Sequence, residues 1–334
     1  MTQLRAGIIG LGVGEQHIAG YRLHRSCEVV AVADLDPAKQ AMAHEKYPEL
    51  RVYGTAEALI DAPDIDVVSI ASYDDDHFAQ VLRAITTGKH VFAEKPLCWT
   101  EKQLATLRQA LARQSGIRLS SNLILRLSPR FVDVRQRVLA GEFGRLFHIE
   151  ADYNYGRLEK ITSGWRARQD FYSVMLGGGI HMIDLVTWLT GDRVDEVTAY
   201  GNAIASAGTP FRFNDMALAI LRWKSGMTGK VAANFACVQP HFHRLLVYGT
   251  AASFENREEH GLLWRSRDRS QPPEAISTAY PGIAKGALIP SFVDGILGNG
   301  TPVVDEDAVF ETMSVCLAVE RSMREGRPVP VTRF

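Results

Sequence analysis

The sequence predicts a two-domain protein, in which an α/β domain with a parallel, doubly wound sheet precedes an α+β domain with a large, mostly antiparallel open sheet. The first third of the chain alternates short apolar runs with helical stretches, which is typical of a parallel sheet covered on both faces. The rest contains longer segments of alternating apolar and polar residues, typical of antiparallel strands. The pattern changes after residue 121, so the predicted domains are residues 1–121 and 122–334.

The expected elements of the first domain follow one another in regular order. Strands are expected over residues 4–9, 28–33, 66–71, 91–93 and 117–121. Helices are expected over about 15–24 and about 100–114, with one more that begins at residue 37 and another that ends at about residue 87. Asp36 precedes Pro37, which is typical of a helix start with Asp36 as the cap and Pro37 in the first turn.

The second domain is expected to be built mainly from strands. These strands are predicted over 147–155, 194–203, 217–223, 228–235 and 243–248, with helices over 129–139, 177–189, 287–297 and 306–324 and a long loop over 265–286. Few helices are available to cover the sheet, and we assign the apolar residues Leu218, Ile220 and Val231 to the face that they leave open. Such a face favours a homodimer or homotetramer formed through this sheet.

Composition indicates an ordinary globular protein. The formal net charge of −1 over 334 residues gives no reason to expect a nucleic-acid partner, and no run of about 20 apolar residues suggests a membrane span. The N-terminal residues Met1–Arg5 lead directly into the first strand, without the apolar stretch of a signal peptide, and we expect a cytoplasmic protein. The four cysteines are far apart in sequence, which indicates neither a disulfide framework nor a zinc site.

A glycine-rich turn follows the first strand as Gly10-Leu11-Gly12-Val13-Gly14. In a Rossmann domain, such glycines let the backbone approach a pyrophosphate at the start of the next helix. Asp34 ends the second strand, 22 residues after Gly12, near the position of a ribose-binding acid. A carboxylate there favours NAD over NADP, because it would repel a 2′-phosphate. The spacing is G-x-G-x-G and not G-x-G-x-x-G, which leaves the exact phosphate contacts open.

A charged pair follows the predicted strand at 91–93, in the order Glu94-Lys95-Pro96. In open α/β sheets, ligands bind at the carboxyl ends of the strands, so Lys95 is a candidate proton donor or acceptor. The alternative is a strand end at which both side chains are merely solvated. The Lys95–Pro96 bond is expected as either cis or trans.

With these motifs, the chain resembles the glucose–fructose oxidoreductase/inositol dehydrogenase (Gfo/Idh/MocA) family over nearly its whole length. The stretch from Gly88 to Pro96 is the most specific match, and Gly178–Asp184 matches the family's His-x-x-Asp element. The resemblance implies that the loop Ala71-Ser72-Tyr73, with His77, packs against the cofactor. Glu94, Lys95 and Asn122, which follow later strands, are further cofactor candidates.

The resemblance also implies that Lys95 is the catalytic lysine and that His181 is its partner beside the reacting carbinol. Many polyol dehydrogenases of the family have an aspartate four residues before that histidine, where this chain has Gly177. The expected catalytic set is therefore incomplete. Asp184 shares a helix face with His181 and is expected to bind substrate or to support His181.

Aromatic and basic residues alternate in the stretch after the strand at 147–155. Rings of this kind stack on sugars, and arginines bind carboxylates or phosphates. The substrate candidates on this basis are Tyr155, Arg157, Lys160, Trp165 and Arg166. The alternative is a solvated loop. A metal site that combines His181 and Asp184 with His241 and His243 is disfavoured, since hydride transfer to nicotinamide requires no metal, and no metal is expected.

The expected function is an NAD-dependent oxidoreductase acting on a secondary alcohol or ketone of a sugar, sugar acid, nucleotide sugar or cyclic polyol. One alternative is an NAD-dependent glycoside hydrolase or epimerase-like enzyme that uses transient oxidation. The other is a non-catalytic NAD-binding protein, which the presence of Lys95 and His181 disfavours.

Overall fold

The computed structural model describes residues 3–280 and 282–334. The N-terminal residues 1–2 and position 281 of the predicted loop lie outside the described residues. The chain forms two units. The first contains the chain up to Ile124 together with Ile283–Glu311 and Phe334, and the second contains Leu125–Gly282 and Thr312–Arg333.

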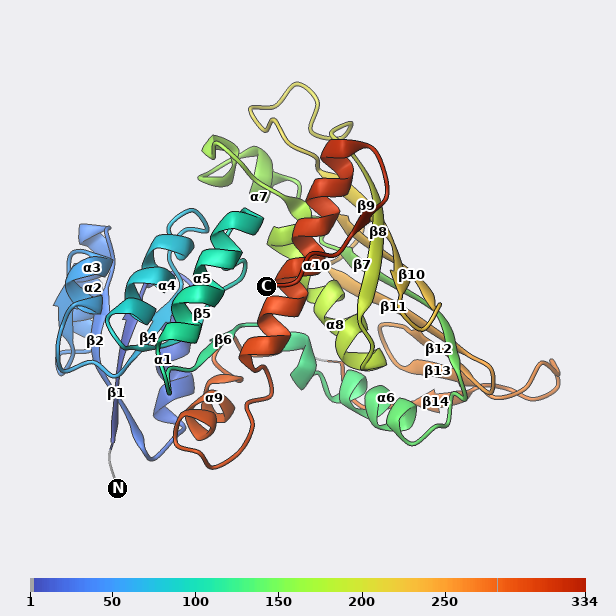
Figure 1. The fold of residues 1–334 in the computed structure, drawn as a ribbon, viewed down its shortest axis with the longest axis horizontal. Helices are drawn as coiled ribbons and strands as arrows, with labels where there is room; N and C mark the ends of the chain where they lie inside the picture. The colour runs from blue at the N-terminus through green and yellow to red at the C-terminus, as the bar shows by residue number, and fades with distance from the viewer. Residues whose placement is uncertain (1–2, 281) are drawn as a thin grey trace. The chain divides into compact units, whose positions relative to one another are not determined.

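The first unit contains a six-stranded parallel sheet in the order β3-β2-β1-β4-β5-β6, as expected for a doubly wound α/β domain. Its strands are β1 (Leu4–Ile9), β2 (Cys27–Ala33), β3 (Arg51–Tyr53), β4 (Val67–Ile70), β5 (His90–Ala93) and β6 (Leu119–Ser121). Its helices are α1 (Glu15–Arg22), α2 (Pro37–Lys46), α3 (Ala56–Ile60), α4 (His77–Thr86), α5 (Glu101–Arg113) and α9 (Ile289–Ile296). Figure 1 shows α4 and α5 side by side along this sheet.

Local sequence explains where two of these helices begin. The Asp36 carboxylate accepts a hydrogen bond from the Ala38 N–H (2.9 Å), which confirms the predicted cap of α2. Thr100 and Gln103 form a reciprocal capping box at the start of α5. The sequence did not predict β3 and α3, because three and five residues are too few to show a period.

Residues 283–311 pack with the first sheet, whereas the predicted division at 121/122 placed them in the second domain. The Phe292 ring lies 5.7 Å from the Phe92 ring of β5. The Ser120 hydroxyl of β6, the edge strand next to β5, donates to the Val304 carbonyl (2.8 Å). These contacts join residues about 200 positions apart, and such contacts leave no local pattern in the sequence.

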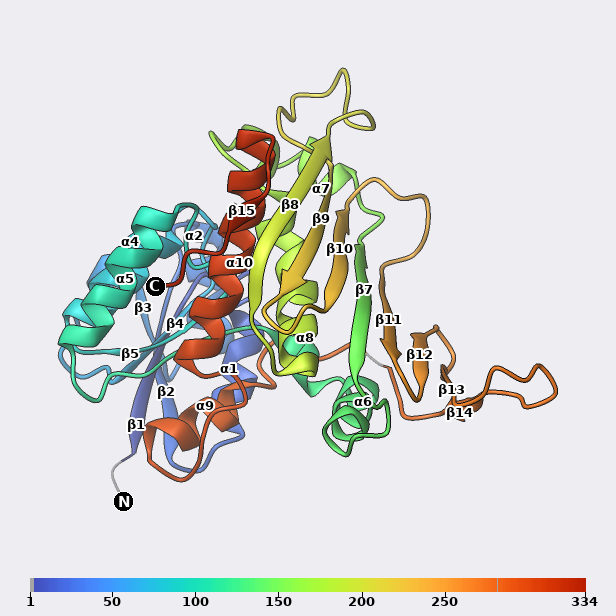
Figure 2. The same ribbon diagram turned by 45° about the vertical axis from the view of Figure 1, so that its right-hand side comes forward.

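The second unit contains a nine-stranded sheet in the order β14-β13-β12-β11-β7-β10-β9-β8-β15 (Figure 2). Neighbouring strands are antiparallel except for β7 and β10, which confirms the mostly antiparallel sheet. The strands are β7 (Leu146–Asn154), β8 (Val194–Asn202), β9 (Met216–Trp223), β10 (Thr228–Asn234), β11 (Phe242–Gly249), β12 (Ser253–Asn256), β13 (Gly261–Trp264), β14 (Glu274–Ile276) and β15 (Val329–Pro330).

The remaining helical segments lie largely in this unit. They are η1 (Ile124–Leu127), α6 (Pro129–Leu139), α7 (Glu159–Thr162), η2 (Arg166–Arg168), the π-helix η3 (Met175–Gly179), α8 (Ile180–Thr190) and α10 (Glu306–Glu325). The prediction of a continuous loop over 265–286 was wrong at Glu274–Ile276, which pairs with β13. The strands β12 to β15 are too short for alternation to indicate them.

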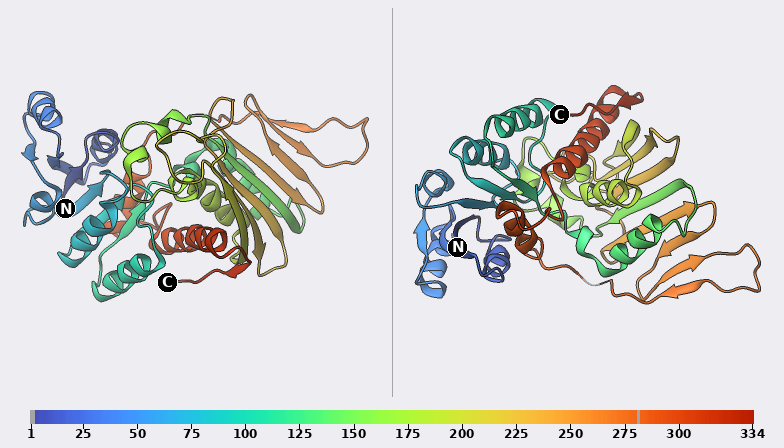
Figure 3. Two further views of the ribbon diagram at one scale, coloured as in Figure 1. Left: turned by 90° about the horizontal axis from the view of Figure 1, so that it is seen from above. Right: turned by 60° about the horizontal axis from the view of Figure 1, so that its bottom comes forward.

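The two faces of the second sheet differ in their covering. Helix α8 and the later part of α10 lie on one face, and the views of Figure 3 show no described helix on the other. Val231 pairs with Ala219 and is fully buried, whereas Ile220 pairs with Lys230 and is 46% exposed. Assigning Val231 to the open face was therefore wrong, because a shift of one residue along a strand reverses the face. Leu218 and Ile220 do lie on the open face.

Candidate active site

The glycine turn after β1 combines two glycines that the backbone requires with one that it does not. Gly10 has φ +86°, and a Cβ there would lie 2.3 Å from the Ala71 carbonyl oxygen; a Cβ at Gly14 would lie 2.3 Å from the Gly10 oxygen. Gly12 meets only the Lys39 ammonium, at 3.8 Å. The space above Gly12 is thus not filled by protein, as close approach of a pyrophosphate requires. Val13, the next residue, is 38% exposed.

The carboxylate of Asp34 lies beside this turn at the end of β2. Its Oδ2 accepts the Leu11 N–H (2.7 Å) and lies 3.3 Å from the Lys39 ammonium, while its Oδ1 accepts the Asp36 N–H (2.9 Å). A carboxylate offers about four acceptor sites, and the three groups beside Asp34 leave its Oδ1 with capacity for one further donor. The residues at this turn therefore fit the adenosine ribose and pyrophosphate of NAD.

The loop after β4 packs against the glycine turn, as expected. Ala71 makes the close approach to Gly10, the Ser72 hydroxyl donates to Gln80 (2.7 Å), and Tyr73 is 50% exposed. His77 differs from these residues. Its imidazole is fully buried, with Nδ1 2.7 Å from the Pro96 carbonyl and Nε2 3.3 Å from the Ser72 carbonyl. His77 thus joins the loop to the turn after β5, and its ring nitrogens face backbone rather than a ligand.

Glu94 at the end of β5 is a buried, ionised carboxylate. The Asn122 amide donates to its Oε1 (2.6 Å), and His17 Nε2 lies 3.4 Å away. Burial alone would raise the pKa of Glu94, but the His17 ring and the charges of Lys285 and Lys95 hold it well below its usual range. This edge of the sheet therefore carries a fixed negative charge next to Lys95.

Lys95 follows Glu94 and is half-buried, and the Lys95–Pro96 bond is cis. Asn122 is fully buried, and its side-chain oxygen has no hydrogen-bond partner among residues 3–280 and 282–334. Lys95, Glu94 and Asn122 come from the ends of β5 and β6, which are neighbours in the sheet. The carboxyl ends of parallel strands are where such folds bind ligands.

His181 lies in the first turn of α8, directly after the π-helix η3, and is 5% exposed. π-Helical turns within α-helices occur frequently at functional sites. The helix predicted over 177–189 begins earlier, at Met175, and its first turn is a π-helical turn, which is wider than an α-helical one. The Tyr153 ring lies 6.0 Å from the His181 ring, and the rings of His241 and His243 lie 5.0 and 5.5 Å from that of Tyr153.

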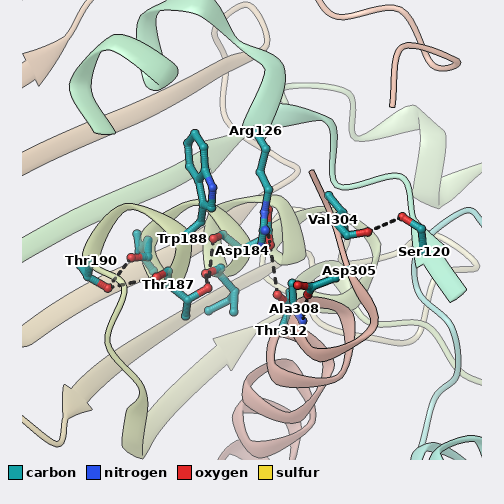
Figure 4. Close-up of polar contacts among 12 residues, drawn as sticks. Ser120, Arg126, Asp184, Thr187, Trp188, Thr190, Val304, Asp305, Ala308 and Thr312 are labelled. Carbon is teal, nitrogen blue, oxygen red and sulfur yellow. Dashed lines mark hydrogen bonds and ion pairs between the residues drawn. The ribbon is translucent and has the colours of Figure 1, made fainter. Parts of the chain in front are cut away.

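Asp184 lies one turn after His181 and is fully buried. Its carboxylate binds the Arg126 guanidinium through three hydrogen bonds of 2.6–3.1 Å and accepts one from the Thr312 hydroxyl (3.2 Å) (Figure 4). Neither carboxylate oxygen is therefore accessible to a ligand. Of the two predicted roles of Asp184, this burial and these partners contradict direct substrate binding, and the support of His181 stays a prediction.

The predicted substrate residues form a partly exposed basic and aromatic segment in the second unit. Tyr155 stacks on Tyr153 at 5.5 Å, and the Arg157 guanidinium lies 5.1 Å from the Tyr155 ring. Arg166 lies 4.2 Å from the Trp165 ring and 5.9 Å from that of Tyr172. Among the described residues, no carboxylate lies within 4.0 Å of the cationic groups of Arg157, Lys160 or Arg166.

Several contributing residues carry no sequence signal. They are Lys39 beside Asp34, Lys285 near Glu94, Arg126 on Asp184, and the rings of Tyr153 and Tyr172. Lys39 is close to Asp34 in sequence but stands in no motif. The other residues lie far in sequence from their partners or stand in no motif. Over the described ranges, no group of three or more His, Cys, Asp or Glu side chains is arranged to hold a metal ion, and no helix is long and apolar enough to cross a membrane.

Comparison with known proteins gives two matches that together cover most of the chain. Residues 4–122 match an oxidoreductase family with an NAD-binding Rossmann fold, and residues 131–255 match the GFO/IDH/MocA C-terminal domain. The first unit thus contains the NAD-binding domain of this family, in agreement with the geometry of the glycine turn.

Individual relatives are distant. Inositol 2-dehydrogenase 2 of Saccharopolyspora erythraea is 26% identical over 67% of this chain, and the match spans 64% of that protein, less than two thirds of its length. The scyllo-inositol 2-dehydrogenase (NAD(+)) of Bacillus subtilis is 23% identical over 98% of this chain and 96% of that protein. The structure of a levoglucosan dehydrogenase in complex with NADH and L-sorbose has the same fold, with a TM-score of 0.86 at 19% identity over 99% of each chain.

Proposed function

The chain belongs to the Gfo/Idh/MocA family of oxidoreductases, and on this basis we propose that it is an NAD-dependent dehydrogenase or reductase. The reacting group is a secondary alcohol or ketone of a carbohydrate-like substrate. The observation that carries this proposal is the Glu94-Lys95-Pro96 turn, which places a half-buried lysine next to an ionised carboxylate at the ligand edge of a Rossmann sheet.

Two groups of residues would hold the cofactor. Asp34 would accept hydrogen bonds from the ribose hydroxyls, and the open backbone at Gly12 would admit the pyrophosphate. Asn122 offers a buried acceptor at the end of β6, and the loop 71–73 borders the glycine turn. When bound, the nicotinamide supplies a hydride acceptor or donor, and the chain itself supplies proton transfer and orientation.

We assign the proton transfer to Lys95 and propose His181 as the second residue that acts on the substrate hydroxyl. In the oxidative direction, Lys95 takes the hydroxyl proton as the carbinol carbon loses its hydride, and in the reductive direction the same proton returns to the carbonyl oxygen. His181 orients the substrate hydroxyl or relays the proton.

The residues around His181 support a carbohydrate-like substrate. Aromatic rings such as Tyr153 and Tyr155 present flat apolar faces of the kind on which sugar rings pack. Arg157, Lys160 and Arg166 provide positive charge that no described carboxylate neutralises. Among the expected classes, we therefore place sugar acids and nucleotide sugars ahead of neutral sugars and cyclic polyols.

A substrate screen tests this proposal. Purified protein with NAD is incubated with inositols, neutral sugars, sugar acids and nucleotide sugars, and NADH formation is followed by absorbance. We expect stoichiometric NADH release with at least one compound, with the acids giving the larger kcat/KM. The absence of NADH release with every class, by a protein that binds NAD, would contradict the proposal.

We further propose that the chain assembles as a homodimer or homotetramer through the open face of the second sheet. Tyr200 and Ile220 lie there with 67% and 46% exposure. Burying such side chains in a partner removes apolar surface from water. Sedimentation should show an oligomer at micromolar concentration and a shift toward monomer for Ile220→Asp, and a wild-type monomer would disprove this assembly.

A further inference from the structure

Position 177 has no side chain, and the hydroxyl of Tyr172 occupies the place where one would be. A Cβ added at Gly177 would lie 2.3 Å from the Tyr172 Oη and 2.8 Å from its Cζ. No real Cβ makes contacts this short, so a larger residue at 177 requires Tyr172 to move. A phenol oxygen thus lies directly on the helical turn that precedes His181.

Several contacts hold Tyr172 in this position. Its ring is 2% exposed and packs edge-on against Phe211 and Phe235, with centroid distances of 5.9 and 6.4 Å. The next residue, Ser173, accepts the Leu176 N–H (3.0 Å) and donates to the carboxyl group of Glu320 on α10. The ring contacts and the hydrogen bonds of the adjacent Ser173 together hold the Tyr172 side chain, so its hydroxyl has a defined position.

The same turn carries the side chain of His181. Gly177 lies in the π-helical turn directly before His181, and the side chains of a helix lean toward its N-terminus, so the His181 side chain is expected on the side of that turn. The Phe235 ring contacts both neighbourhoods, since it lies 6.4 Å from Tyr172 and 6.0 Å from Tyr153, which in turn lies 6.0 Å from His181. Tyr172 and His181 thus belong to one buried cluster.

We infer that Tyr172 is the positioning residue for His181 and supplies the polar group that residue 177 lacks. This chain places a neutral hydroxyl on that turn, from a residue five positions upstream of Gly177. A hydroxyl both donates and accepts, so it fixes the orientation of a neighbouring imidazole without adding negative charge. The inference rests on the proposed function for its kinetic consequences but not for its structural ones.

The first test removes only the oxygen, in Tyr172→Phe. We expect kcat to fall by about 10- to 100-fold, the usual effect of one hydrogen bond to a charged group, while KM and NAD affinity stay unchanged. The pH profile of kcat should also be displaced, which a merely structural loss would not cause. Tyr47→Phe is the matched control, because the Tyr47 hydroxyl donates to Glu15 (3.0 Å) at the end of α2 and belongs neither to the site nor to the open face of the second sheet; its kinetics should equal those of wild type.

A rescue experiment tests directly whether the Tyr172 hydroxyl takes the place of a polar side chain at position 177. Gly177→Asp alone is expected to reduce activity, because the new side chain collides with Tyr172. In the double variant Tyr172→Ala/Gly177→Asp the space is free, and activity should exceed that of Tyr172→Ala. A double variant no more active than Tyr172→Ala, with Tyr172→Phe equal to wild type, would overturn the inference.

A measurement without turnover separates this inference from the proposed function. The pKa of His181 is followed by NMR of histidine-labelled protein, with the His181 signal assigned by its loss in His181→Asn. Tyr172→Phe should shift this pKa, and Tyr47→Phe should not. If the pKa of His181 is the same in Tyr172→Phe and wild type, the inference is overturned. If this pKa differs but the wild-type protein oxidises no substrate, only the proposed function is contradicted.

Discussion

The guanidinium of Arg126 and the carboxylate of Asp184 form a buried ion pair inside the second unit (Figure 4). The two side chains are 9% and 0% exposed, and Arg126 Nε lies 3.1 and 3.0 Å from the two carboxylate oxygens. Asp184 is one turn beyond His181 on α8, and Arg126 lies on η1. The pair therefore fixes the position of the helix that presents His181.

The first prediction is that Asp184→Asn lowers stability rather than substrate affinity. Removing one partner leaves the Arg126 charge buried without compensation, which costs on the order of 3–5 kcal/mol in the free energy of unfolding. Urea denaturation at pH 7 measures this change. The double variant Arg126→Leu/Asp184→Leu should lose less than the sum of the two single leucine variants, since no isolated charge remains.

The exposed pair of Arg222 and Glu196 provides the control for this experiment. Its side chains are 57% and 37% exposed, so Arg222→Ala should change the free energy of unfolding by less than about 1 kcal/mol. An Asp184→Asn protein as stable as wild type, with a raised KM, would show instead that Asp184 serves the substrate.

The second prediction concerns Glu320, whose carboxyl is buried on α10. Burial raises its pKa to about 7, against the opposing effects of the Ser173 hydroxyl and the Arg324 charge. Because the pKa is higher in the folded state than in the unfolded chain, its stabilising contribution is complete below about pH 4.5 and is lost as the pH rises through 7. Glu320→Gln cannot ionise and should escape this loss.

The measurement is the difference in free energy of unfolding between Glu320→Gln and wild type at pH 5 and pH 8. We expect the difference to move in favour of the variant at pH 8, by up to roughly 3 kcal/mol. Glu258→Gln, at an exposed position, should show no such pH dependence. A constant difference between the two pH values for Glu320→Gln would refute the assigned burial effect.

The third prediction concerns the choice of cofactor. Asp34→Ser should weaken NAD binding, because an acceptor for the ribose hydroxyls is lost. It should also reduce the preference for NAD over NADP, because the repulsion of the 2′-phosphate is relieved. The Lys39 ammonium, 3.3 Å from Asp34 in wild type, then becomes available to a phosphate. Adding Lys39→Ala should abolish the gain in NADP affinity.

Fluorescence titration of both cofactors against wild type, Asp34→Ser and Asp34→Ser/Lys39→Ala measures these affinities. Wild-type protein that binds NADP more tightly than NAD would show that the role of Asp34 is assigned incorrectly. Equal NADP affinity in the single and double variants would show that Lys39 does not bind the 2′-phosphate.

Most of the first domain could be predicted because local residues determine its elements. Apolar runs lead into positions with special backbone demands, such as Gly10 at φ +86°, and Asp36 caps its helix as its type suggests. Short elements such as β3 and β14 escaped prediction, since three residues show no period. Residues 283–311 were assigned to the second domain because only contacts distant in sequence hold them to the first.

The candidate site was predictable where residues stand in a motif and not where they meet only in the fold. Lys95 and His181 were proposed from short stretches of sequence, and their roles stay predictions. Arg126 is 58 positions from Asp184, and no pattern indicates that the two side chains meet. Gly177 was recognised as a departure, but only the fold shows that Tyr172 occupies its place.

The fourth prediction addresses the central claim, that Lys95 transfers the proton in an NAD-dependent oxidation or reduction. The measurement is the turnover number of Lys95→Ala at saturating NAD, with the best substrate of the screen and with NAD affinity determined in parallel. Lys102→Ala, an exposed lysine on α5, is the control and should behave as wild type. We predict unchanged NAD affinity and a turnover lowered by a factor on the order of 10²–10⁴ for Lys95→Ala. A Lys95→Ala protein with near-normal turnover would contradict the account.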